Sequence, residues 1–160
     1  MSTVKTDVFI NKTYTCSVSG HREFYDKIDK KTIKQIFISI IEKGIDTFLV
    51  GMAVGFDTLC FKILQELKYD YNFRIIACVP CENQDKNFSL SQKKEYKKML
   101  EEADEKILIN KNYTPYCMLE RNRFMVDNSS VLVCYLRSKK GGTNYTYEYA
   151  KKQGIVILKV

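Results

Sequence analysis

Short apolar runs alternate with amphipathic segments along all 160 residues of the chain. Residues 29–43 show helical spacing most clearly, because Ile33, Phe37 and Ile40 recur at intervals of three and four on one face. Strands that alternate with helices are typical of βαβ units. We expect strands at 14–19, 47–50, 73–79, 106–109, 130–136 and 155–160, and helices at 29–43, from Asp57 to Leu67, at 91–102, from Thr114-Pro115 through Met125, and at 143–153.

This order of elements predicts an α/β fold, a Rossmann-like three-layer sandwich with a mainly parallel sheet and helices on both faces. No linker or repeat interrupts residues 1–160, so we expect one domain. Residues 1–13 are left as either a frayed start or an extra edge strand. Thr114 and Pro115 are expected to open a helix, with Thr as the N-cap and Pro at the first helical position.

The chain is basic, with 26 Lys and Arg residues against 19 Asp and Glu residues, a net charge of +7. Such a balance favours an anionic partner, although a solvated lysine-rich surface explains it equally well. No apolar stretch approaches the roughly 20 residues that span a bilayer, and no signal peptide is evident. We therefore expect a cytoplasmic protein without membrane contact.

Six cysteines and one histidine match no metal-ligand spacing, so we expect neither a metal nor a cofactor. Cys78 and Cys81 form a CxxC pair, but the pair follows an apolar run and does not open a helix, which disfavours redox chemistry. Four cysteines lie among apolar neighbours and are expected to be buried free thiols: Cys16, Cys60, Cys78 and Cys134.

Glycines and unusual polar residues follow the expected strands, where parallel sheets bind ligands. Gly51 and Gly55 precede one helix, and Gly141 and Gly142 precede another; either turn can offer free N–H groups to an anion, or can be a tight turn only. The turn at Gly141 is the stronger candidate, because two lysines precede it.

Arg121 shares a helical stripe with Met118 and Met125, so its guanidinium is expected to point inward and to need an anionic partner. That partner is either a ligand or a carboxylate of Asp57, Glu120 or Asp127. Arg22 is a candidate phosphate clamp, and the lone His21 is either a ligand contact or a hydrogen-bonded loop residue.

Five segments taken together, at residues 16–22, 48–57, 80–86, 113–123 and 141–146, resemble YpsA-type proteins of the SLOG superfamily. The resemblance implies a Rossmann-like fold that binds nucleotides or NAD- and ADP-ribose-derived ligands. A sister branch, the LOG enzymes, cleaves nucleoside 5′-monophosphates with an Arg in a Met-x-x-Arg helix and a Glu after a Gly-Thr turn. Met118-Leu-Glu-Arg121 matches the helix, but Thr146 stands where the Glu is expected.

Because a threonine cannot supply the charge that stabilises an oxocarbenium-like state, this departure favours a binding protein over an enzyme. In this hypothesis the turn at 141–143 and Thr146 hold a phosphate, while Arg22 and Arg121 neutralise it. Asp57 and Glu82 accept from ribose hydroxyls, and Asn83 contacts the base. The expected ligand-binding residues are Ser17, Gly20, His21, Arg22, Gly51, Met52, Ala53, Gly55, Asp57, Pro80, Glu82, Asn83, Arg121, Asn122, Gly141, Gly142, Thr143 and Thr146.

Two other functions stay open. A phosphoribohydrolase would use Arg121 with Asp57, Glu82 or Glu120 as the replacement carboxylate. Binding of single-stranded DNA would draw on the positive charge and the 11 tyrosines, and we rank nucleic acid below a small nucleotide as the partner. Tyr145 and Tyr149 lie on a helix face that either forms a homodimer or a higher homo-oligomer, or covers the sheet.

Overall fold

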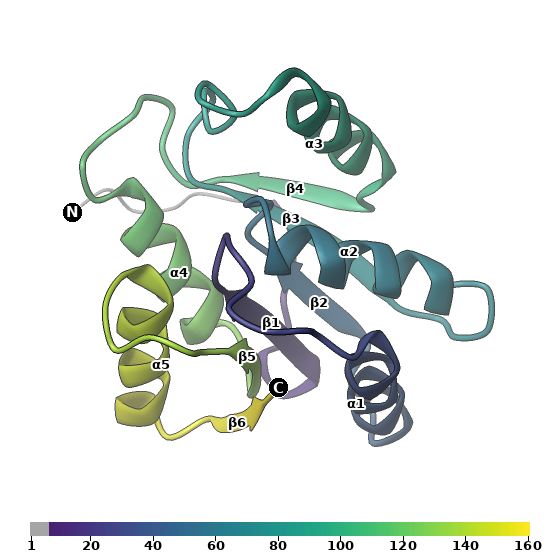
Figure 1. The fold of residues 1–160 in the computed structure, drawn as a ribbon. Coiled ribbons are helices and arrows are strands. Elements are labelled where there is room, and N and C mark those ends of the chain that lie inside the picture. Colours follow the sequence, from purple (N-terminus) through teal and green to yellow (C-terminus); the bar gives the residue numbers. More distant parts are fainter. Residues whose placement is uncertain (1–6) are drawn as a thin grey trace.

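The computed structural model describes residues 7–160, which form a parallel sheet flanked by helices (Figure 1). The strands are β1 (Thr15–Gly20), β2 (Thr47–Val50), β3 (Arg74–Val79), β4 (Glu105–Leu108), β5 (Val131–Tyr135) and β6 (Val156–Lys159). The α-helices are α1 (Lys30–Glu42), α2 (Phe56–Leu67), α3 (Leu90–Glu102), α4 (Cys117–Asp127) and α5 (Gly142–Gln153).

The strand order is β4-β3-β2-β1-β5-β6, and each neighbouring pair is parallel. The predicted α/β Rossmann-like fold is therefore confirmed. The chain builds outward from β1 to β4 on one side, and then returns through α4 to add β5 and β6 on the other. This reversal creates a topological switch point between β1 and β5, where open α/β sheets bind ligands.

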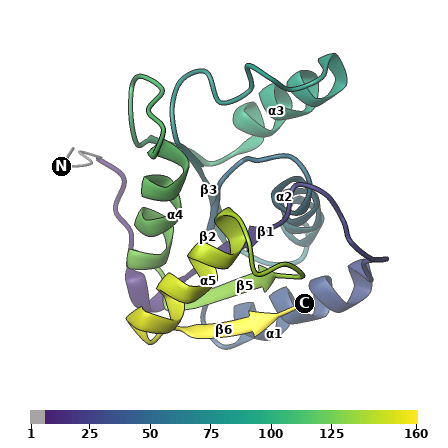
Figure 2. The ribbon, with the colours of Figure 1, turned by 60° about the vertical axis from the view of Figure 1, so that its left-hand side comes forward.

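The helices cover both faces of the sheet (Figure 2). Helices α1, α2 and α3 share one face, and their apolar side chains form a single core with the sheet around Phe37, Phe48 and Leu64. Helices α4 and α5 lie together on the other face, over smaller clusters around Met125 and Val126. All six cysteines are buried free thiols, as the four with apolar neighbours were expected to be. Within residues 7–160, no helix has the length and apolar character needed to cross a membrane.

One expected element boundary is wrong, and one of the two alternatives for the N-terminal segment is ruled out over the described residues. Helix α4 begins at Cys117 and not at Thr114-Pro115, because the Cys117 N–H donates to the Thr114 carbonyl at 3.2 Å and closes a separate turn there. Residues 7–11 form no strand, and Lys12–Tyr14 is a short 3-10 helix, so no edge strand forms over residues 7–13. The remaining part of that prediction, residues 1–6, lies outside the described residues.

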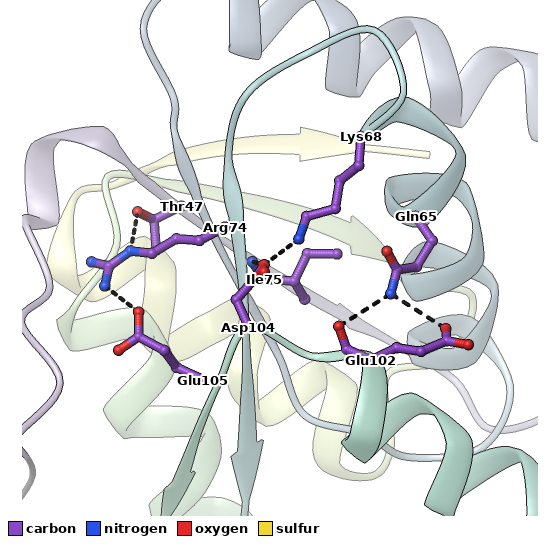
Figure 3. Close-up of polar contacts among 8 residues, drawn as sticks. All are labelled: Thr47, Gln65, Lys68, Arg74, Ile75, Glu102, Asp104 and Glu105. Atoms are coloured by element: carbon purple, nitrogen blue, oxygen red, sulfur yellow. Dashed lines mark hydrogen bonds and ion pairs between the residues drawn. The ribbon is translucent and has the colours of Figure 1, made fainter.

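A polar network ties the amino ends of β2, β3 and β4 together, far from the carboxyl ends (Figure 3). Arg74 donates from Nη1 to Glu105 Oε1 at 2.6 Å and from Nε to Thr47 Oγ1 at 3.1 Å. Asp104 accepts from the Ile75 N–H at 2.7 Å and pairs with Lys68. These contacts link the three strands at their amino ends, away from the loops that follow their carboxyl ends.

Gly20, the last residue of β1, and Gly55, just before α2, allow the loop after β1 to pack closely against the start of α2. A Cβ at Gly20 would lie 2.4 Å from the Phe56 ring, and one at Gly55 would lie 2.3 Å from the Arg22 carbonyl oxygen. The Phe56 N–H donates to the His21 carbonyl at 3.1 Å across this close contact. Glycine is therefore required at both positions for close packing between the end of β1, the loop that follows it and the start of α2.

His21 joins the loops after β1 and β5. Its Nε2 accepts from the Arg137 N–H at 2.8 Å, and its ring contacts Tyr25 and Tyr135. Burial, helped by the positive charge of Arg137, lowers the pKa of His21 below its usual 6.5. A neutral imidazole is what the contact needs, since a protonated Nε2 cannot accept.

Substituting Gly20→Ala should lower the free energy of unfolding by about 1–3 kcal/mol, because the new methyl group overpacks against Phe56. Gly142→Ala is the control: its Cβ meets nothing closer than 4.0 Å, so stability should stay within about 0.5 kcal/mol. Urea unfolding measures both. Equal stability of the two variants would contradict the packing role of Gly20.

His21→Gln should remove one component of the pH dependence of stability. The His21 pKa is lower in the folded protein, so its contribution is complete above about pH 6.5 and is lost as the pH falls through the folded pKa. The glutamine keeps an acceptor for Arg137 but does not titrate. The stability difference between the wild type and the variant should therefore shrink or reverse on acidification. A difference that is independent of pH from 7.5 to 5 would contradict this role.

Candidate functional site

A cavity of about 400 Å³ opens at the switch point, beyond the carboxyl ends of β1 and β2. We call it the switch-point cavity. Its walls come from the loop after β1, the turn between β2 and α2, one face of α4 and the start of α5. Its volume is within the range of small-molecule sites. The predicted residues that line it are Gly20, His21, Arg22, Gly51, Ala53, Asp57, Arg121, Asn122, Gly141, Gly142 and Thr143.

The structure places the other predicted residues elsewhere. Ser17 is buried in β1 and donates to the Met125 carbonyl at 2.9 Å. The Thr146 hydroxyl donates to the Gly142 carbonyl at 2.8 Å, within α5. Met52 is fully buried in the core at a φ of 64°, in the left-handed region. These three side chains are committed to structural contacts and do not line the switch-point cavity.

The remaining predicted residues are also outside this cavity. Gly55 lines a separate apolar cavity between α2 and α3, and Asn83 lines a third. Pro80 and Glu82 line none of these three cavities, and Glu82 is exposed. The predicted residues of the loop after β3 therefore do not contribute to the switch-point cavity, although the sequence indicated that they would.

Arg121 lies inward, as predicted, with only 4% of its surface exposed. It donates from Nη1 to the carbonyls of Gly51 and, at 3.4 Å, Cys78, and from Nε to Asn122 Oδ1 at 2.8 Å. A Cβ on Gly51 would lie 2.8 Å from this guanidinium. Gly51 therefore gives close approach to Arg121, where the sequence indicated close approach to a ligand.

Asp57 is the acidic neighbour of Arg121. Its Oδ2 accepts from the Ala53 N–H at 3.1 Å and would lie 3.0 Å from a Cβ on Gly51. Burial raises the pKa of Asp57 to about 6, although Arg121, the Ala53 N–H and Arg22 all lower it. Burial likewise lowers the pKa of Arg121. Both shifts show that desolvation exceeds the attraction between these groups.

The other carboxylates considered for Arg121 have their own partners. Glu120 accepts from Asn110 Nδ2 at 2.9 Å, and Asp127 accepts from the Tyr149 hydroxyl at 2.6 Å. Of the three candidates for a replacement carboxylate, Asp57 lines the cavity, whereas Glu82 and Glu120 do not. Among residues 7–160, no cluster of three or more His, Cys, Asp or Glu side chains is placed to hold a metal ion.

The two glycine turns differ in what occupies the helix start that follows. At α2, the Phe56 N–H is taken by the His21 carbonyl, and Asp57 already places a carboxylate in the first turn. At α5, as at α2, no side chain caps the helix, but a Cβ on Gly141 would meet nothing within 4 Å and one on Gly142 would meet nothing closer than 4.0 Å. Of the two helix starts, the one at α5, beside Lys140, is thus left open to an anion.

The cavity that Asn83 lines has a volume of about 390 Å³. It adjoins the switch-point cavity and shares Arg22, Ala53 and Met118 with it. We call it the side cavity. Gln84, which sequence reasoning missed, lines it and is 7% exposed. Its Nε2 donates to the Gly51 carbonyl at 2.9 Å. Nothing in the polar, aperiodic segment at 81–91 distinguishes Gln84 from its neighbours, so no sequence signal was available.

Solved structures with this fold include two DNA processing proteins. DNA processing protein A (DprA) from Streptococcus pneumoniae superimposes with a TM-score of 0.66 over 94% of this chain, at 16% identity. The Helicobacter pylori protein, described by its single-stranded DNA binding mode, gives 0.66 over 91% at 16% identity. The chain spans 50% and 64% of those two proteins, and at this identity the likeness shows the fold alone.

Sequence relatives extend over most of the chain. The uncharacterized SPbeta prophage-derived protein YoqJ of Bacillus subtilis is 33% identical over 140 residues, which is 75% of this chain and 81% of YoqJ. The UPF0398 protein YpsA of the same organism is 27% identical over 128 residues, 78% of this chain and 71% of YpsA. The YpsA family, described as the YspA SLOG family, matches residues 18–155. Because the family model matches residues 18–155, most of the chain, this chain belongs to the YpsA family of SLOG proteins.

Proposed function

We propose that the switch-point cavity binds a nucleotide or an NAD- or ADP-ribose-derived ligand, with a phosphate group at the start of α5. The observation that carries this proposal is the uncapped start of α5, which lines the cavity together with Lys140 and Arg22. Helix N–H groups together with lysine and arginine side chains are a frequent phosphate-binding combination. Such a site would sense, regulate or sequester a nucleotide signal.

Two features of the cavity support a ligand larger than phosphate. The cavity adjoins the side cavity across Arg22 and Ala53, so an elongated molecule can extend from one into the other. Asp57 and Asn122 also line the wall between α2 and α4, where ribose hydroxyls can donate to a carboxylate or an amide oxygen.

Gly142→Asp should weaken binding of ribose 5-phosphate, AMP and ADP-ribose at least about tenfold, because it places a carboxylate against the phosphate position. The fold should survive, since the site is open and an acidic residue suits the first turn of a helix. Lys97→Gln, on the exposed side of α3, is the matched control, because it lowers the net charge by the same one unit. Calorimetry measures each affinity.

Equal affinities of Gly142→Asp and Lys97→Gln would contradict the phosphate position. No heat with folded wild-type protein, from these ligands or from NAD and cyclic ADP-ribose, would contradict the proposed function. Free adenine measured in the AMP samples distinguishes binding from hydrolysis. Release that is lost in Asp57→Asn would establish the phosphoribohydrolase alternative, which rests on Asp57 lying in the same cavity as Arg121.

A second candidate function is binding of single-stranded DNA. The Helicobacter pylori structure and a set of exposed aromatic side chains favour it. Tyr25, which is 62% exposed, lines the switch-point cavity, and Tyr113, which is 68% exposed, lines the side cavity. Tyr116 is 67% exposed at the start of α4. Aromatic side chains beside cationic ones are the usual stacking platform for unpaired bases.

If DNA binds here, the double variant Tyr113→Ala, Tyr116→Ala should weaken binding of a thymidine 20-mer about tenfold or more, since each stacked base contributes about 1–3 kcal/mol. Tyr69→Ala is the control, because Tyr69 is 92% exposed beyond the end of α2. Fluorescence anisotropy at several salt concentrations measures the affinity. Binding that ignores salt, or that Tyr69→Ala weakens as much, would contradict this function.

A further inference from the structure

We infer that the side cavity binds the base of the ligand, and that Gln84 selects a base with an exocyclic amino group. This inference rests on the proposed function, since it assumes a phosphate at the start of α5. It departs from the sequence-based expectation, which assigned the base contact to the exposed neighbour Asn83.

The orientation of the Gln84 amide follows from its one hydrogen bond. The Gly51 carbonyl can only accept, so the Gln84 group 2.9 Å away must be the amino group Nε2. The amide oxygen Oε1 is therefore directed away from Gly51. Because Arg121 donates to the same carbonyl, Gly51 holds both side chains in place at the boundary of the two cavities.

Gln84 Oε1 is buried and has no hydrogen-bond partner within the described residues. A buried acceptor without a donor costs about 1–3 kcal/mol, a cost that a ligand can remove. An oxygen that is held as an acceptor binds groups that donate, such as the amino group of adenine or cytosine. It gives no such contact to a keto oxygen or to a ring carbon.

The rest of the side cavity suits a flat aromatic ring. Phe88 and Tyr113 contribute aromatic surfaces, and Met118 contributes an apolar side chain next to the switch-point cavity. Phe88 is fixed by an edge contact with the buried Tyr96, at 5.7 Å between ring centroids. A base between these groups would lie in apolar surroundings, where one hydrogen bond to Gln84 has a large effect on specificity.

The experiment compares ligands that differ in the amino group alone. Wild-type protein should bind AMP at least about tenfold more tightly than purine riboside 5′-monophosphate, which lacks only the amino group. Gln84→Met should bring the ratio of AMP to purine riboside 5′-monophosphate close to one and leave the affinity for ribose 5-phosphate unchanged. Asn83→Ala, on the same loop, should keep the wild-type ratio.

The outcomes separate this inference from the proposed function. Equal affinities for AMP and ribose 5-phosphate, or a ratio that survives Gln84→Met, would overturn the assignment of the base site. Loss of the ratio in Asn83→Ala with retention in Gln84→Met would transfer the role to Asn83. Failure of ribose 5-phosphate and of both nucleotides to bind would instead overturn the phosphate site on which the inference rests.

Discussion

The guanidinium of Arg121, buried beneath Gly51, connects the elements that make up the site. It brings α4 against the carboxyl ends of β2 and β3 through the carbonyls of Gly51 and Cys78. Taking this charge out of water is costly, and burial lowers the pKa of Arg121 even with Asp57 nearby. A chain that needed only stability would be served as well by an apolar side chain here. The buried charge lies instead at the floor of a cavity, where it fixes the helix that forms one wall.

Glycine has two different physical roles around this cavity. At Gly20, Gly51 and Gly55 a Cβ would lie within 3.0 Å of a side chain or the backbone, so glycine permits packing between elements. At Gly141 and Gly142 a Cβ would meet nothing closer than 4.0 Å, so packing does not require glycine there. The second pair leaves the start of α5 uncovered. Space that the protein itself does not fill is what a ligand needs.

The alternation of apolar runs and helical stripes was enough to predict the fold and most element boundaries, because burial in a parallel sheet imposes those patterns directly. The stripe through Met118 and Met125 likewise predicted the inward Arg121. Contacts between distant segments were beyond reach. Nothing local in the sequence shows that Gln84 reaches Gly51 from a loop 33 residues away. The start of α4 was misplaced because the Thr114-Pro115 signal also suits a turn that ends before the helix.

The cations that line the switch-point cavity differ in how much of their charge is free to act on a ligand. Arg121 is buried, donates to backbone carbonyls and has Asp57 as its acidic neighbour, so little of its charge is left for a ligand. Arg22 and Lys140 are exposed, and they line the cavity together with the uncapped start of α5. A phosphate is therefore best placed away from Arg121, toward α5. In the proposed phosphate site, Arg121 would position the wall of the cavity, and the exposed cations and the helix N–H groups would contact the phosphate.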